Sequence, residues 1–232
     1  MTAAAQQLSL PLPVRAAQGQ ADFLVTDSNR DAVAWLDSWP DWPGQGLVLH
    51  GPPASGKSHL LAIWRKRADA SLLDGEALTM EQALTAPGSV AVENADRCAE
   101  PRPLLHLINH VRASGGTLLL TAAHPASQWQ VALPDLSSRL KALPSVGLQA
   151  PDDALLAGLA AKLFADRQII VPDNVVAFML TRLERSCASI AEAVERLDQA
   201  AWTERRALTL RLARKTLDPK ILNPQVKPDQ GG

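Results

Sequence analysis

The chain has 232 residues, enough to bury a substantial core as one large domain or as a domain with a smaller companion. Its formal net charge of −1 excludes a global positive field of the kind that drives non-specific binding to nucleic acid, so we expect any link to DNA to pass through a protein partner. The two cysteines, Cys98 and Cys187, form no CxxC pair, which argues against a disulfide framework or a zinc knuckle.

The first residues carry no targeting signal. No apolar run is long enough to span a bilayer, and the first twenty residues lack the basic start and apolar core of a secretory signal. We therefore expect a cytoplasmic protein with no membrane partner. Within the leader, residues 1–19, the stretch "QQLSLPL" at 6–12 alternates leucines as an extended chain does, and Pro11 opposes a helix. Such a segment is either without a role or docks into a groove on a partner.

Strands and helices alternate through residues 20–149. The first predicted helix follows "VTDSN", with Ser28 or Asn29 as its cap. Three continuous apolar runs then predict buried parallel strands, and "LLHLINHVR" between the last two has helical spacing and a glycine stop. The three runs are "GLVLH", "SVAVE" and "GTLLLTA". This alternation predicts an α/β domain built on a parallel sheet.

The pattern changes near residue 150, beyond which we predict only helices. Their expected ranges are about 152–166, 173–185, 188–205 and 210–217. The sequence thus predicts a small all-helical domain over 150–218 after the α/β domain. The remaining residues, 219–232, are rich in proline and glycine and are expected to form a flexible tail.

The motif "GPPASGKS" at 51–58 matches GxxxxGK[ST] between a predicted strand and a predicted helix, which is the context of a phosphate-binding loop. Backbone N–H groups of such a loop and the helix N-terminus surround phosphate oxygens, Lys57 reaches the β- and γ-phosphates, and Ser58 offers its hydroxyl to Mg²⁺. We therefore predict ADP or ATP with Mg²⁺ as cofactors. The residues predicted to bind nucleotide are Gly51, Pro52, Pro53, Ala54, Ser55, Gly56, Lys57, Ser58 and His59.

A phosphate-loop ATPase also needs an acidic residue at the end of a neighbouring strand, and "SVAVENADR" supplies the best candidate. Glu93 at the strand end would serve the metal together with Ser58. Asn94 follows, where many such ATPases keep a second carboxylate that orients water, and an amide is never a base. Weak or absent intrinsic hydrolysis is therefore expected. Asp96 is interpreted as a solvated turn residue rather than a catalytic one.

Arg139 lies in "PDLSSRLKAL" at 134–143, near the end of a predicted helical turn after the third strand. An arginine there is either an ordinary surface cation or, in an assembling ATPase, a finger that stabilises transition-state charge at a neighbour's γ-phosphate.

Taken in order, these motifs resemble the DnaA-related AAA+ ATPases, and among them the Hda family of replication-initiation regulators. The resemblance covers about residues 20–217 and includes the second acidic motif "VENADR", the box "PDLSSRL" and the lid helix "SIAEAVERLDQAA". It implies an AAA+ nucleotide-binding domain followed by a helical lid. Because the chain ends soon after the lid, without the further helix-turn-helix domain of an initiator, no sequence-specific DNA binding is expected, whereas a homo-oligomer is compatible with the resemblance.

The resemblance also gives the leader a role. Hda-like proteins carry an N-terminal QLxLPL motif that binds the DNA polymerase III β sliding clamp, and the leader fits it with Gln7, Leu8, Ser9, Leu10, Pro11 and Leu12. The implied activity is stimulation in trans of ATP hydrolysis on DnaA by Arg139, which negatively regulates initiation of chromosomal replication. Clamp tethering would raise the effective concentration at DnaA.

Two positions depart from the family pattern. Ala188 occupies the place early in the lid helix where relatives commonly have a nucleotide-sensing arginine, and Thr121 is followed by Ala122 and Ala123 where a polar sensor is expected. Both departures favour a nucleotide-bound scaffold, with ADP as the expected resting ligand, over a motor. The alternatives are a helicase-loader-like ATPase and a passive clamp-binding adaptor with a vestigial nucleotide site.

Other features are interpreted as structural. His106 and His110 have the spacing of a metal-binding pair on a helix, but no third ligand accompanies them. Trp35, Trp39 and Trp42 cluster near the start of the α/β domain, where packing is the expected role.

Overall fold

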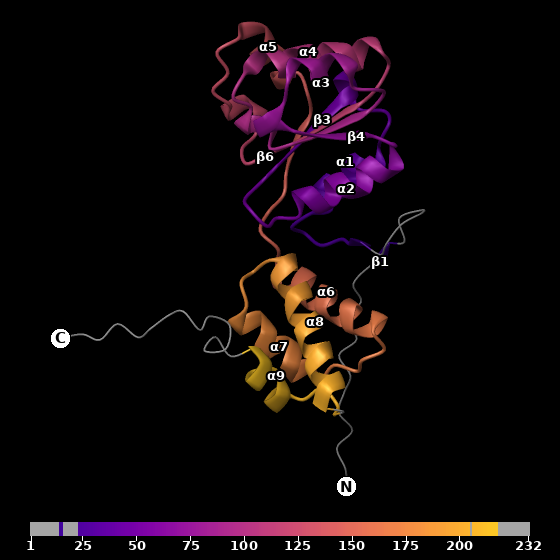
Figure 1. Cartoon of the computed structure of the whole chain (residues 1–232), viewed down its shortest axis with the longest axis vertical. Coiled ribbons are helices and arrows are strands. Elements are labelled where there is room, and N and C mark those ends of the chain that lie inside the picture. The colour runs from indigo at the N-terminus through magenta and orange to yellow at the C-terminus, as the bar shows by residue number, and fades with distance from the viewer. Residues whose placement is uncertain (1–13, 16–22, 205, 218–232) are drawn as a thin grey trace, which may run out of the picture.

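The computed structural model describes residues 14–15, 23–204 and 206–217 (Figure 1). Its centre is a five-stranded parallel sheet in the order β4-β5-β6-β3-β7. In chain order the strands are β3 (Gly46–His50), β4 (Ser71–Asp74), β5 (Val90–Glu93), β6 (Leu118–Ala122) and β7 (Ser145–Gly147). The prediction of a parallel α/β domain is confirmed. A short antiparallel pair, β1 (Val14–Arg15) and β2 (Phe23–Leu24), precedes it.

The three predicted strands are the buried centre of the sheet. All five residues of β6 are buried, as are the first four of β3 and the first three of β5. Strands covered by helices on both faces read as continuous apolar runs, which is why these segments were visible in the sequence.

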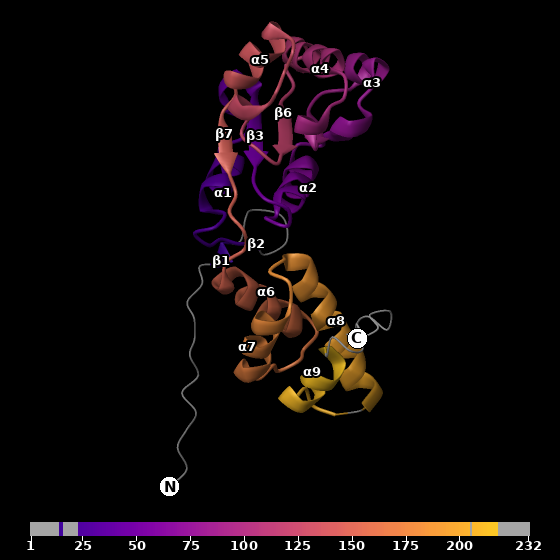
Figure 2. The same cartoon turned by 90° about the vertical axis from the view of Figure 1, so that its left-hand side faces the viewer.

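Helices cover both faces of the sheet (Figures 1 and 2). Helices α1 (Arg30–Asp37) and α2 (Lys57–Arg67) pack on one face through a core that includes Leu36, Leu61 and Trp64. On the other face lie α3 (Met80–Thr85), α4 (Pro101–Ala113) and α5 (Pro134–Lys141), in a second core that includes Leu107 and Leu140. This division places the phosphate loop and the helix of Arg139 in different layers.

The tryptophans of the α1–α2 layer pack as expected. Trp42 stacks on Trp64 with ring centroids 5.4 Å apart, and Trp39 meets Trp64 edge to face at 6.4 Å. The indole N–H of Trp39 donates to Thr117 Oγ1 at 2.9 Å, and that of Trp42 donates to the carbonyl of Trp35 at 2.7 Å. These contacts anchor α1 and α2 to each other beneath the sheet.

The predicted cap of α1 behaves differently from the expectation. Asn29 occupies the N-cap position, yet its side chain makes no bond to the helix. Its Oδ1 instead accepts from the N–H of Thr26 at 3.0 Å, and its Nδ2 donates to the carbonyl of Leu24 at 3.0 Å. The side chain thereby ties the incoming chain to the helix start.

The helical lid follows the sheet domain. It contains α6 (Asp153–Asp166), α7 (Asp173–Arg182), α8 (Cys187–Glu204) and α9 (Leu210–Leu217), packed around a core of its own that includes Phe164, Met179 and Val194. All four predicted lid helices are confirmed, with α7 ending three residues earlier than expected. Asp152 caps α6 by accepting from the N–H of Leu155 at 2.7 Å.

Over the parts of the chain that the structure describes, every helix is too short or too polar to cross a bilayer. The clamp-binding motif at 6–12 lies outside those parts.

Candidate functional site: the phosphate loop and its neighbours

The phosphate loop joins the end of β3 to the start of α2 at the carboxyl edge of the sheet. Its two glycines are required by the backbone path. A Cβ on Gly51 would lie 2.4 Å from the carbonyl oxygen of Leu148, and Gly56 has a left-handed φ of 97°. Only glycine meets both demands without displacing the backbone.

Lys57 lies over the loop that precedes it. Its Nζ donates to the carbonyl oxygens of Gly51 and Pro52, both at 2.7 Å, and approaches Ser55 Oγ at 3.4 Å. Burial lowers the pKa of Lys57, and Asp96 opposes that shift. The ammonium group is therefore held where a phosphate oxygen would replace the loop carbonyls as its partner.

The start of α2 adds a second source of positive potential. The first N–H groups of an α-helix lack intrahelical acceptors and carry the positive end of the helix dipole. The first turn of α2 contains no acidic side chain that would satisfy them. His50 ends β3 opposite Ala122 of β6, two residues before His124, and burial, then His124, then Lys57 lower the pKa of His50. This edge is consequently suited to an anion.

Ser58 and Glu93, the predicted metal-side pair, meet across the two neighbouring elements. The hydroxyl of Ser58 donates a hydrogen bond to Glu93 Oε1, although the residues are 35 positions apart in the chain. A hydroxyl and a carboxylate of this kind are the protein ligands that Mg²⁺ takes alongside nucleotide phosphates. The predicted placement of Glu93 at the end of β5 is correct.

Asn94 follows Glu93 in the left-handed conformation, with a φ of 54°. Asparagine tolerates that conformation better than most residues, which gives this position a structural reason for its side chain. The N–H of Asn94 donates to Thr121 Oγ1 at 3.2 Å, and Thr121 is buried in β6. The hydroxyl of Thr121, the candidate nucleotide sensor, thus accepts a hydrogen bond from the backbone directly after β5.

The interpretation of Asp96 as a solvated turn residue is wrong. Its Oδ2 accepts a hydrogen bond from the N–H of Ala123 at 2.8 Å, and the residue is half-buried. The carboxylate therefore joins the loop after β5 to the end of β6, on the loop side of the sheet. Its partner is a backbone amide 27 positions away, which no local pattern could reveal.

Arg139 lies on α5, as predicted. Leu136 and Leu140 of the same helix are buried against the core, whereas Arg139 is only half-buried. Among the described residues, no hydrogen bond or ion pair involves the Arg139 guanidinium. The helix is thus anchored, while Arg139 has no partner among the residues that the structure describes.

The lid contributes a different residue from the one expected. Ala188 is exposed near the start of α8 and offers no charge. Lys162 of α6 instead acts on His59, which follows the phosphate loop. Burial lowers the pKa of His59, and the positive charge of Lys162 lowers it further. The sequence analysis did not identify Lys162, because nothing local distinguishes one lysine on a helical face.

Of the two histidines on α4, only His110 contacts the backbone of a neighbouring segment. His110 Nε2 lies 3.0 Å from the carbonyl oxygen of Ala86, and His106 is exposed. In the described ranges, no group of three or more His, Cys, Asp or Glu side chains is arranged to hold a metal ion.

These residues fit a nucleotide with a divalent cation. The loop needs glycine at its close approach, its lysine is held by exchangeable carbonyl contacts, and the Ser58–Glu93 pair faces the same edge. The donor set is one of amides, ammonium, hydroxyl and carboxylate, which suits a phosphate-bound hard cation.

Comparison with known proteins identifies the lid. Residues 156–217 match the family model for the lid domain of Hda. The match covers the helical lid, whose sequence is therefore similar to the lid domain of Hda.

The fold as a whole is shared with solved structures of DnaA and RuvB. Domain III of the replication initiation protein DnaA from Thermotoga maritima is 16% identical with a TM-score of 0.67, over 85% of this chain and 95% of that one. AMPPCP-bound DnaA from Aquifex aeolicus is 12% identical with a TM-score of 0.64, over 79% and 67% of the two chains. A variant of RuvB from Thermotoga maritima is 13% identical with a TM-score of 0.67, over 87% and 72%.

Proposed function

We propose that this Hda-like chain binds ADP or ATP with Mg²⁺, is tethered to the DNA polymerase III β sliding clamp through residues 6–12, and stimulates hydrolysis of the ATP bound to DnaA. By converting the initiator to its ADP form it limits new rounds of chromosomal replication. The observation that carries the proposal is Arg139, which lies on an anchored helix without a partner in the described ranges, in a chain whose lid matches that of Hda.

Arg139 is the proposed finger in trans. It lies on α5, on the face of the sheet opposite α2 and the phosphate loop of its own chain (Figure 2). A guanidinium that is aligned with developing phosphoryl charge contributes on the order of 10³–10⁵ in rate. Because Leu136 and Leu140 fix the helix, the guanidinium can meet a second protein without a large loss of backbone entropy.

The nucleotide of this chain has a supporting role in the proposal. The phosphate-loop residues, Lys57 above all, would hold its phosphates, and Ser58 with Glu93 would hold the cation. When bound, Mg²⁺ neutralises phosphate charge and fixes the phosphate geometry. The protein groups keep the loop and the lid in one arrangement.

Intrinsic hydrolysis is proposed to be weak or absent. Asn94 cannot accept a proton from water, and Asp96 is held by the N–H of Ala123. Ala188 brings no cation to the nucleotide. A ligand that is held and not turned over suits a regulator that acts on a partner, with ADP as its resting form.

The clamp tether is tested by following conversion of labelled ATP to ADP on DnaA, with clamp loaded on DNA. The full chain is compared with a chain lacking residues 6–12, and each is assayed with and without clamp. We expect conversion only with the full chain and the clamp, because tethering supplies effective concentrations in the millimolar range. Conversion by the shortened chain at the full rate would refute the tether, and conversion by neither would leave a passive adaptor.

A further inference from the structure

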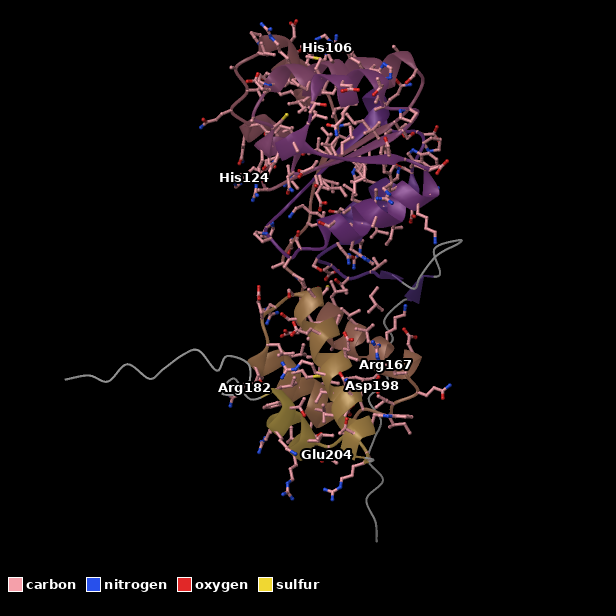
Figure 3. The ribbon with its side chains drawn as sticks, viewed as in Figure 1. His106, His124, Arg167, Arg182, Asp198 and Glu204 are labelled. Carbon is pink, nitrogen blue, oxygen red and sulfur yellow. The ribbon has the colours of Figure 1, made fainter. Side chains whose placement is uncertain are left out.

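The lid carries a groove that no part of the proposed function uses. It has a volume of about 610 Å³ and is lined by residues from the end of α6 and from α8 onward. Those residues are Arg167, Ile169, Asp198, Ala201, Trp202 and Arg206. Figure 3 shows Arg167 and Asp198 side by side in the lid, where Arg167 Nε lies 3.5 Å from Asp198 Oδ2.

Two large apolar side chains of the lid are left in water, and one of them, Trp202, lines the groove. Trp202 is 84% exposed and Ile170 is 93% exposed, far more than the other exposed large apolar residues of the described chain. The indole ring of Trp202 therefore presents an open face at the groove. An aromatic face without a partner is suited to stacking on a flat group.

Cations gather around Glu204, two residues after Trp202 in α8. Lys215 Nζ donates to Glu204 Oε1 at 2.7 Å, and this bond, then the charge of Lys215, then those of Arg206 and Arg211 lower the pKa of Glu204. Three basic side chains thus converge on one carboxylate, within a turn of the helix from Trp202. Figure 3 places Glu204 at the end of the lid away from the sheet.

Two further arginines of the lid lie on α7 and α9. Arg182 and Arg214 both lie over the ring of Phe178, each with its guanidinium carbon 6.0 Å from the ring centroid. From Arg206 to Leu217 the chain carries four basic side chains, Arg206, Arg211, Arg214 and Lys215, and no acidic one. The whole chain, in contrast, carries −1.

We propose that this surface, the lid groove with the basic end of α8 and α9, binds single-stranded nucleic acid without sequence preference. A base stacks on Trp202, and Arg206, Arg211 and Lys215 contact consecutive phosphates. Cations spread beyond the groove fit a ligand with regularly repeated charge, and an open aromatic face beside them is how sequence-tolerant single-strand sites hold bases. The alternative occupant, an acidic protein segment, would also pair with the cations but does not require stacking of a flat base on Trp202.

The proposal does not depend on nucleotide binding or on DnaA. It is tested by fluorescence anisotropy of fluorescein-labelled dT15 with the full-length protein, between 50 and 200 mM NaCl. Three phosphate contacts predict a slope of about −2 in a plot of log affinity against log salt concentration, from roughly −0.7 per contact. Excess ADP with Mg²⁺ should leave this binding unchanged, and competition by ADP would overturn the proposal by assigning the oligonucleotide to the phosphate loop.

Substitutions at Trp202 and Arg211 distinguish the contribution of base stacking from that of phosphate contacts. Trp202→Ala should weaken dT15 binding by about 5- to 150-fold, whereas Trp202→Phe should retain most of the affinity because a stacking ring remains. Arg211→Ala should reduce the magnitude of the salt slope by roughly 0.7. The matched control is Arg102→Ala, which removes an exposed arginine from α4 of the other domain.

Two results would overturn the proposal. One is equal dT15 affinity for the wild-type, Trp202→Ala and Arg211→Ala proteins. The other is failure to bind dT15 together with Trp202-dependent binding of a labelled peptide of alternating glutamate and leucine, which would assign the groove to an acidic protein. Circular dichroism of each variant checks that the lid remains folded. Folding should be retained because Trp202 and Arg211 are exposed.

Discussion

The phosphate loop and helix α5 differ in whether their charged side chains have bonding partners. At the loop, Lys57 is bonded to carbonyls, Ser58 to Glu93, and Asp96 to a backbone amide. On α5, Arg139 has none of these contacts among the residues that the structure describes, although the helix beneath it is well packed.

The difference separates two kinds of site. Groups that are bonded to one another hold a geometry before the ligand arrives, which suits a ligand carried by this chain. A cation with no partner contributes little to the stability of its own fold, and its bonding capacity remains for a second protein. Four predictions test this contrast, in order of decreasing effect.

Among these four, the largest effect is expected at Lys57. Lys57→Ala removes the cation over the phosphate loop and should weaken ADP–Mg²⁺ binding by about 10- to 150-fold, since hydrogen bonds to charged groups are worth roughly 1.5–3 kcal/mol. Isothermal titration calorimetry measures the affinity. Lys66→Ala, which removes an exposed lysine at the other end of α2, is the matched control. Equal affinities for the two variants would show that the loop does not hold phosphate.

Gly51 tests whether the loop geometry is built in. A Cβ at Gly51 would lie 2.4 Å from the Leu148 carbonyl oxygen, so Gly51→Ala should lower the free energy of unfolding by about 1–3 kcal/mol in urea titrations. Gly88 also has a positive φ, of 58°, but an added Cβ there meets nothing within 4 Å. Gly88→Ala therefore measures backbone strain alone, and an equal loss in the two variants would contradict the close approach.

The third prediction compares the stability lost on removing a hydrogen-bonded arginine with that lost on removing Arg139. Arg196 Nη2 donates to the carbonyl of Thr216 at 2.6 Å, so Arg196→Ala should cost about 0.5–1.5 kcal/mol of unfolding free energy. Arg139→Ala should change it by less than about 0.5 kcal/mol. Thermal and urea unfolding of both variants give the comparison. A loss at Arg139 as large as that at Arg196 would show that Arg139 is a structural residue.

The smallest effect concerns the lid contact. Burial lowers the pKa of His59 most, and the positive charge of Lys162 lowers it further. Lys162→Met removes that charge, so the pKa of His59 should rise toward its ordinary value of 6.5. Because the folded-state pKa is below the unfolded one, stability is unaffected above about pH 6.5 and falls as the pH drops below it. The variant should lose less stability on acidification. Proton NMR titration of His59 would refute the contact if its pKa did not move.

The sequence predicted what is periodic or buried on both sides. The central strands, the lid helices, α4 and α5 were recognised because their apolar patterns extend over several residues. The edge strands β4 and β7 were not predicted: β4 exposes every second residue, and in the three residues of β7 only Val146 is buried. The six-residue helix α3 is too short to show a period.

The site was predictable in its motif and less so in its long-range contacts. The phosphate loop, Glu93 and Arg139 all lie where their local context placed them. The bond of Asp96 to the N–H of Ala123 and the effect of Lys162 on His59 join elements far apart in the chain. No short window of sequence encodes such contacts, because they arise from the packing of strands and of the lid.

The measurement that tests the central claim most directly is single-turnover decay of labelled ATP preloaded on DnaA, with DNA-loaded clamp and the wild-type, Arg139→Ala or Lys141→Ala protein. Lys141 is an exposed basic residue of the same helix. We expect the Arg139→Ala protein to lose the stimulation, by a factor on the order of 10³ or down to the basal rate, while clamp binding and the Lys141→Ala rate are unchanged. Stimulation by Arg139→Ala at the wild-type rate would contradict the assignment of Arg139 as the finger.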